Sequence, residues 1–117
     1  MIKAVLFDFT QTLVDSADGF RAAEKQAQDR IFRDLSLTSG EEFLSNYRKI
    51  RKEFHSRSNF SRKAMWQEVY WYYCHESDSQ SLEKWEDDYW QKVKSETNLF
   101  PETERVLKKL ASKYRLA

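Results

Sequence analysis

Residues 3–16, KAVLFDFTQTLVDS, decide how the rest of the chain is interpreted. Apolar side chains dominate residues 3–7, and Asp8 follows them directly. A short apolar run bounded by polar residues is typical of a buried β-strand. An acid at the carboxyl end of such a strand lies where ligands collect in open α/β sheets. The stretch therefore predicts a strand that presents the Asp8 carboxylate, followed by a polar turn that contains Thr10.

The composition indicates one soluble domain of 117 residues. Charged residues make up 33% of the chain and aromatic residues 15%, so aromatic rings must supply much of any core. The formal net charge is +1, which gives no reason to expect nucleic acid or a membrane surface as a partner. Cys74 is the single cysteine, and the apolar run at residues 4–7 is too short for a signal peptide. We therefore expect a cytoplasmic protein.

The middle of the chain is predicted to be helical, because glycine occurs only at positions 19 and 40 and proline only at position 101. Four segments carry apolar residues at helical spacing, approximately 18–35, 40–54, 62–75 and 82–96. Ser39 and Ser61 are the predicted start signals of the second and third helices. Similar lengths and short connections favour an antiparallel bundle.

A different unit begins at about residue 98, NLFPETERVLKKLASKYRLA. Pro101 suits the first turn of a helix, because its φ torsion is preset and no N–H donor is needed there. Val106, Leu107, Leu110 and Tyr114 are predicted to form the buried side of this helix. Residues 116–117 are expected to begin another strand.

The opening stretch resembles the first motif of the haloacid dehalogenase-like hydrolase superfamily, hhhhDxDGT(L/V), often continued as VDS. Asp8 matches the first acid, Thr12 the final threonine, and residues 13–16 the continuation. The resemblance implies an α/β fold: the N-terminal part of a Rossmann-type core, one strand plus a helix, with an inserted four-helix cap. Residues 1–15 would form the first core strand and catalytic loop, residues 16–97 the helical cap, and residues 98–117 the return to the core.

The resemblance also implies a magnesium-dependent phosphatase in which Asp8 is the nucleophile and forms an aspartyl-phosphate. Mg²⁺ would be bound by the Asp8 carboxylate and the main-chain carbonyl of Thr10, since oxygen ligands suit this hard ion. Phe9 and Thr10 would bind the phosphate. The expected partner is a small phosphorylated substrate, or a halogenated one if the chain is a dehalogenase.

Thr10 and Gln11 depart from the family pattern. An acid usually occupies the position of Thr10 and acts in proton transfer, which a threonine hydroxyl cannot do near neutral pH. The chain could therefore be a phosphatase with another proton donor, a protein with a persistent phosphoenzyme, a dehalogenase, or a relative that no longer hydrolyses anything. Gln11 replaces the glycine of the turn, which predicts that its φ torsion need not be positive.

Two features of the predicted cap are candidates for binding. Arg57, Asn59 and Arg62 lie in or beside the polar segment HSRSNFSRK, where they would meet an anionic substrate, although a solvated connection explains the same composition. In WQEVYWYYCHE, helical spacing assigns Trp66, Tyr70 and Tyr73 to the cap core and directs Trp71 and Tyr72 elsewhere. Self-association is expected to use either these aromatic helices or the unpaired strand.

The family's remaining motifs follow its second strand: a Ser or Thr that holds the phosphate, a Lys or Arg, and an acidic pair. None of them is found in the 117 residues. We therefore expect the chain to be the N-terminal part of a larger hydrolase and to be inactive by itself. The competing hypothesis is a helical interaction module without catalysis.

Overall fold

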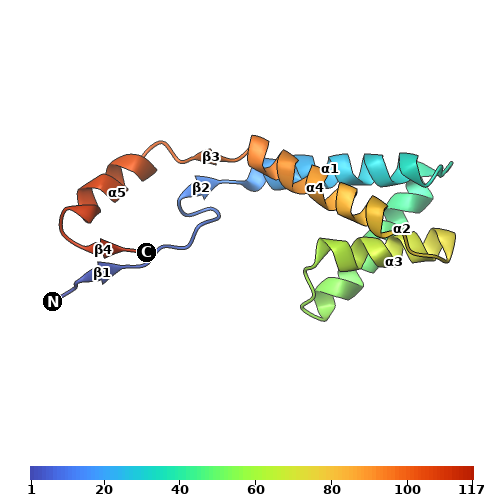
Figure 1. Cartoon of the computed structure of the whole chain (residues 1–117), viewed down its shortest axis with the longest axis horizontal. Helices are drawn as coiled ribbons and strands as arrows, with labels where there is room; N and C mark the ends of the chain where they lie inside the picture. The colour runs from blue at the N-terminus through green and yellow to red at the C-terminus, as the bar shows by residue number, and fades with distance from the viewer. The chain divides into compact units, whose positions relative to one another are not determined.

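The computed structural model describes residues 1–117, which form five helices and four strands of two residues each (Figure 1). The chain is mainly helical, as predicted, and its short strands fit a partial α/β fold. It divides into two compact units: Met1–Ala22 with Lys92–Ala117, here called the α/β unit, and Ala23–Gln91, here called the helical unit. The helices are α1 (Ala17–Asp34), α2 (Gly40–Ser56), α3 (Arg62–Cys74), α4 (Ser79–Ser95) and α5 (Thr103–Ala111).

The helices of the helical unit begin where side chains accept hydrogen bonds from otherwise unpaired backbone N–H groups. Ser39 Oγ accepts from the Glu42 amide at the start of α2, and Ser61 Oγ accepts from the Ala64 amide at the start of α3. Both starts were predicted. Asp78, which the sequence analysis did not single out, serves α4 by accepting from the Gln80 amide at 3.1 Å.

Aromatic side chains supply most of the core of the helical unit. Its largest fully buried side chains are Trp66, Trp85, Tyr47, Phe43, Ile31 and Val69. Trp66 meets the ring of Tyr89 edge-on, with ring centroids 5.6 Å apart. Trp71 and Tyr72 are half-exposed, which agrees with their predicted direction away from the core. Tyr70 and Tyr73, predicted as core, are only partly buried.

The α/β unit contains a β-α-β connection. Strand β1 (Ala4–Val5) pairs in parallel with β4 (Arg115–Leu116), and α5 directly precedes β4. The pairing extends beyond the two named residues, because the Phe7 amide donates to the Ala117 carbonyl at 2.8 Å. A second, antiparallel pair joins β2 (Val14–Asp15) to β3 (Asn98–Leu99), which come directly before α1 and after α4 along the chain.

Three expectations for the α/β unit were wrong in detail. The first strand is only partly buried: Leu6 is 81% exposed, whereas Val5 and Phe7 are half-buried, and β1 has one neighbouring strand. Val106 on α5 is 38% exposed, whereas Leu107, Leu110 and Tyr114 of the same predicted face are partly buried. Pro101 lies in the turn before α5, and the helix begins two residues later at Thr103, where the side-chain hydroxyl donates to the Leu13 carbonyl at 2.8 Å.

Gly19 marks a close contact within the α/β unit. A Cβ atom added at Gly19 would lie 2.8 Å from the Val93 carbonyl oxygen and 3.1 Å from Thr97 Oγ1. Any larger residue would force the backbones of α1 and α4 apart at this point.

None of the helices combines the length and the apolar character that crossing a membrane would need.

Candidate active site

Asp8 follows the last backbone hydrogen bond of the β1–β4 pair, which is donated by Phe7. Its side chain is exposed, and no hydrogen bond or ion pair involves its carboxylate. The structure thus places Asp8 just past the carboxyl end of a parallel strand, as predicted. In open α/β sheets this edge is where ligands bind.

The turn after Asp8 closes around one carbonyl oxygen. The Phe9 carbonyl accepts from the amides of Thr12, Leu13 and Val14 at 3.3, 3.0 and 3.3 Å. Thr10 is exposed, forms a parallel bridge with Val14, and makes no side-chain hydrogen bond. Phe9, Thr10 and Asp8 therefore lie on one short exposed segment, and nothing in the structure tests their predicted binding of phosphate.

The backbone conformation of Gln11 contradicts the prediction that its φ torsion need not be positive. Its φ torsion is +57°, in the left-handed region that favours glycine. The Gln11 amide donates to the Val14 carbonyl at 2.8 Å, which closes the turn. Hydrogen bonds of the side chain offset the torsional preference of glutamine, because its Oε1 atom accepts from the amides of Ser16 and Ala17 at 2.6 and 3.0 Å.

The predicted magnesium site is chemically suitable but partial. A carboxylate and a main-chain carbonyl are the kinds of oxygen that Mg²⁺ prefers, and this ion often takes only one or two carboxylates. However, no three His, Cys, Asp or Glu side chains are grouped as a metal site would need. Asp8 and Thr10 would thus hold the ion only together with water or substrate oxygens.

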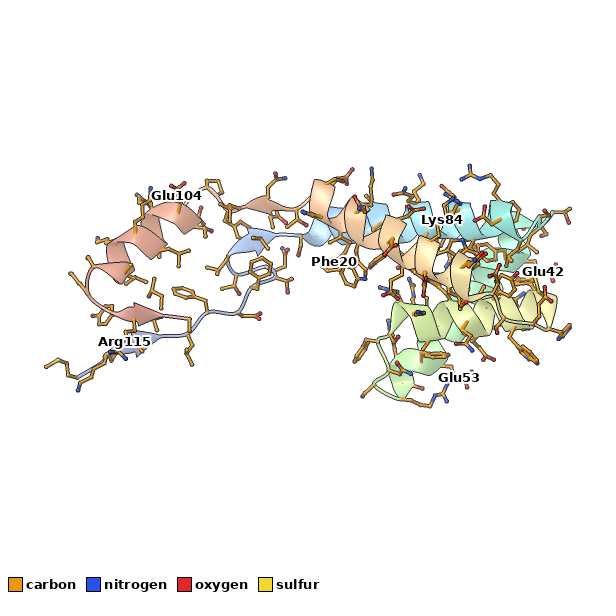
Figure 2. The ribbon with its side chains drawn as sticks, in the orientation of Figure 1. Phe20, Glu42, Glu53, Lys84, Glu104 and Arg115 are labelled. Carbon is orange, nitrogen blue, oxygen red and sulfur yellow. The ribbon has the colours of Figure 1, made fainter.

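The residues of the predicted substrate loop lie in the helical unit and have differing partners. Arg57 pairs with Glu53, labelled in Figure 2, at 3.5 Å, and its guanidinium lies over the Phe54 ring. Asn59 Oδ1 accepts from the Ser61 amide at 3.1 Å and so shapes the connection between α2 and α3. Both side chains are exposed, and their role in binding stays a prediction.

Arg62 differs from Arg57 and Asn59, because its guanidinium points into the helical unit. It lies 3.0 Å from the Glu24 carboxylate and over the ring of Tyr89, and its side chain is 23% exposed. The positive charge is thus already balanced within the protein. This position disfavours the predicted contact with substrate.

Glu24 is the centre of a partly buried polar cluster that the sequence did not predict. Its carboxylate accepts a hydrogen bond from the Tyr47 hydroxyl at 2.9 Å and pairs with Arg51 at 3.3 Å and with Arg62. Trp66 Nε1 in turn donates to the Tyr47 oxygen at 2.9 Å. Burial, followed by the negative charge of Glu24, raises the pKa of Tyr47 above its ordinary value. Glu24 Oε2 and Arg62 Nη1 lie 3.0 Å apart as an ion pair, but neither of these two buried atoms makes a hydrogen bond.

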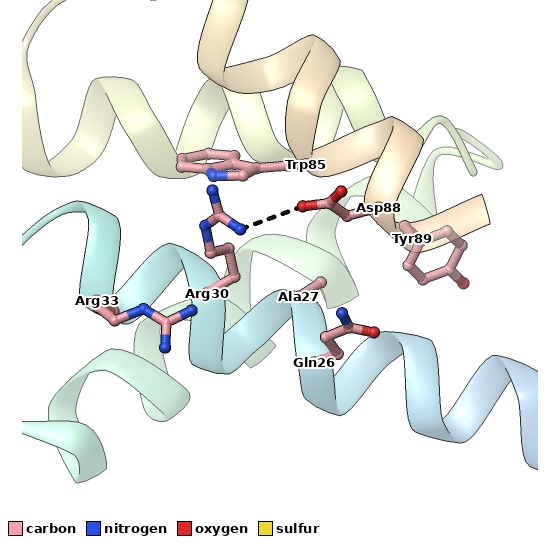
Figure 3. Close-up of a pocket in the computed structure, with 7 residues that line it drawn as sticks. All are labelled: Gln26, Ala27, Arg30, Arg33, Trp85, Asp88 and Tyr89. Carbon is pink, nitrogen blue, oxygen red and sulfur yellow. Dashed lines mark hydrogen bonds and ion pairs between the residues drawn. The ribbon is translucent and has the colours of Figure 1, made fainter. Parts of the chain in front are cut away.

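A small pocket of about 40 Å³ lies between α1 and α4 in the helical unit (Figure 3). Arg30, which lines it, pairs with Asp88 at 3.3 Å and with Asp34 at 2.8 Å. Burial opposes ionisation of Asp34, but hydrogen bonds from Trp85 and Arg30 and the nearby positive charges bring its pKa below the ordinary value. The pocket is too small for a substrate, and its central charge is neutralised.

Comparison with known proteins gives partial similarity to solved structures. No family model matches the chain, and no curated protein matches it. Among solved structures, a hydrolase of the haloacid dehalogenase-like family from Streptococcus pneumoniae aligns with 98% of this chain at 22% identity and a TM-score of 0.43. The chain spans 47% of that protein's length.

Proposed function

We propose that the chain carries the nucleophile segment of a haloacid dehalogenase-like hydrolase, and that this hydrolase is a magnesium-dependent phosphatase acting through an aspartyl-phosphate on Asp8. The observation that supports the proposal is the position of Asp8. Asp8 follows Phe7, whose amide makes the last hydrogen bond of the β1–β4 pair, and the helical unit is inserted along the chain between β1 and α5. The motif resemblance and the order of the elements thus point to the same residue.

The proposed chemistry begins with the free Asp8 carboxylate. One carboxylate oxygen attacks phosphorus, so that an O–P bond forms while the bond from phosphorus to the leaving oxygen breaks, and that oxygen takes a proton from solvent water. Water then attacks the phosphorus of the aspartyl-phosphate, which releases phosphate and restores the carboxylate. Bound Mg²⁺ would neutralise charge on the phosphoryl oxygens.

The test of the proposal is hydrolysis of a generic aryl phosphate with Mg²⁺. We expect the 117-residue chain to be inactive, and a longer form that continues past Ala117 into further strands of a Rossmann-type core to be active. In the longer form, Asp8→Asn should abolish turnover, because the amide is a poor nucleophile, while circular dichroism stays unchanged. Asp15→Asn, at an exposed carboxylate of the same segment, is the matched control. Turnover that survives Asp8→Asn, or full activity of the short chain, would refute the proposal.

A second expected result concerns Thr10. If the missing acid slows hydrolysis of the intermediate, Thr10→Asp should accelerate dephosphorylation by about 10²–10⁴, the usual contribution of a positioned acid or base. Single-turnover measurement of phosphate release from the phosphorylated protein checks this. Unchanged kinetics would mean that another group supplies the proton.

Two alternative functions have specific support. A dehalogenase would use the same nucleophile to displace halide from carbon and would need no acid at the position of Thr10; its turnover would not depend on Mg²⁺. A helical interaction module is favoured by the separate aromatic core of the helical unit, in contrast to the exposed α/β unit. Such a module predicts that the backbone NMR spectrum near Asp8 is indifferent to Mg²⁺ and to phosphate analogues.

A further inference from the structure

We propose that Gln11 is a positioning residue that locks the turn carrying Asp8 and Thr10 onto the first turn of α1. The hydrogen bonds of Gln11 to Ser16 and Ala17, here called the lock, are observed directly. Their importance for function rests on the proposed function of Asp8. Three sets of contacts carry the inference: those of the Gln11 backbone, those of its side chain, and those of the turn it closes.

The backbone of Gln11 is held in an unfavourable conformation. With φ at +57°, a residue with a Cβ atom is disfavoured relative to glycine. Such a conformation persists only where surrounding contacts determine it. The hydrogen bonds of the Gln11 side chain are contacts of this kind.

The side chain of Gln11 takes the role of an N-terminal cap for α1. Its Oε1 atom accepts from the Ser16 amide, the Ser16 hydroxyl and the Ala17 amide at 2.6, 3.1 and 3.0 Å. The first amides of a helix have no acceptor within the helix. A capping acceptor normally comes from the residue immediately before the helix, but here it comes from the preceding turn. The turn and the helix are thereby joined by side-chain hydrogen bonds as well as by the chain.

The positions of Asp8 and Thr10 depend on this turn. Neither side chain has a hydrogen bond of its own, so only the backbone fixes them. The backbone is anchored on one side by the three amides that donate to the Phe9 carbonyl. On the other side, the Leu13 carbonyl accepts from the hydroxyl of Thr103 and from the amide of Phe100. Gln11 lies between these anchors and is the residue that ties them to α1.

The experiment compares Gln11→Met, which keeps the length of the side chain without an acceptor, with Gln11→Glu, which keeps the acceptor. Amide hydrogen exchange in the full chain should be about fivefold faster at Ser16 and Ala17 in Gln11→Met, the effect of losing a typical cap. Gln11→Glu, made together with Asp15→Asn because Gln11 Nε2 lies 3.4 Å from the Asp15 carboxylate, should retain the protection, since a carboxylate is favourable at a helix N-terminus. Equal exchange in Gln11→Met and the unchanged protein would overturn the proposal.

Backbone dynamics separates positioning from simple capping. In Gln11→Met the NMR order parameter of the Thr10 amide should fall from about 0.85 to below about 0.6, and Gln11→Glu with Asp15→Asn should restore it. A residue that only caps α1 would leave the order of Thr10 unchanged, which would refute the positioning role. Neither measurement uses Mg²⁺ or substrate, so their outcome is distinct from that of the Asp8→Asn test.

A further variant covers the case in which Gln11→Met does not fold. Gln11→Gly removes the backbone strain and the acceptor together. If the lock matters, Ser16 and Ala17 should lose protection although the turn is relaxed. Protection equal to or greater than that of the unchanged protein would overturn the proposal.

Discussion

Trp66→Ala is expected to lower the free energy of unfolding of the protein by about 3–5 kcal/mol, the usual range for truncating a buried aromatic residue. The Trp66 side chain is fully buried in the helical unit. Its ring packs edge-on against Tyr89, and its Nε1 atom donates to the Tyr47 hydroxyl at 2.9 Å. The substitution therefore creates a cavity and also removes a donor from the Glu24 cluster.

Urea denaturation followed by circular dichroism measures this effect. The matched control is Trp71→Ala, the same chemical change on the same helix at a side chain that is 53% exposed. Because little buried surface is lost there, we expect a change of less than about 1 kcal/mol. Similar losses in the two variants would mean that α3 does not bury the face that contains Trp66.

Glu24→Leu is expected to lower the free energy of unfolding by about 3 kcal/mol, the lower end of the range for breaking a buried ion pair by removing one partner. The substitution leaves Arg62 and Arg51 without their carboxylate and removes the acceptor of the Tyr47 hydroxyl. The lower end applies because the two arginine side chains are 23% and 34% exposed, so water can partly solvate them.

Two further variants test the cause of the Glu24→Leu effect. Glu24→Gln keeps an oxygen acceptor for Tyr47 without the charge. Its stability should lie between that of Glu24→Leu and that of the unchanged protein. Combining Glu24→Leu with Arg62→Met should recover part of the loss, since an apolar pair can replace a buried ion pair at little cost. If Glu24→Leu alone is as stable as the unchanged protein, the cluster does not stabilise the fold. Thermal unfolding of all four proteins provides the comparison.

The features that the sequence predicted are those with local causes. The starts of α2 and α3 follow from Ser39 and Ser61, whose hydroxyls accept from amides three residues later. The direction of Trp66 and Trp71 follows from helical spacing. The position of Asp8 after a strand follows from the apolar run before it. Each of these signals is contained within a few consecutive residues.

The features that were missed depend on partners far away in the sequence. Burial of the first strand could not be judged from its composition, because exposure depends on how many strands and helices cover it. Arg62 was assigned to a loop contact, but its partner Glu24 lies on another helix and leaves no periodic signal. For Gln11, the preference of the residue gave the wrong torsion, because hydrogen bonds to Ser16 and Ala17 outweigh it.

The contact at Gly19 has a consequence for how the chain could change over evolution. A Cβ atom at Gly19 would lie 2.8 Å from the Val93 carbonyl oxygen. The backbone just before residues 23–91 is therefore close to the backbone just after them. An insertion whose two ends meet can be lengthened, shortened or exchanged without displacing the elements that flank it. The close approach at Gly19 thus allows residues 23–91 to vary in length while the chain leaves and re-enters the α/β unit at neighbouring positions.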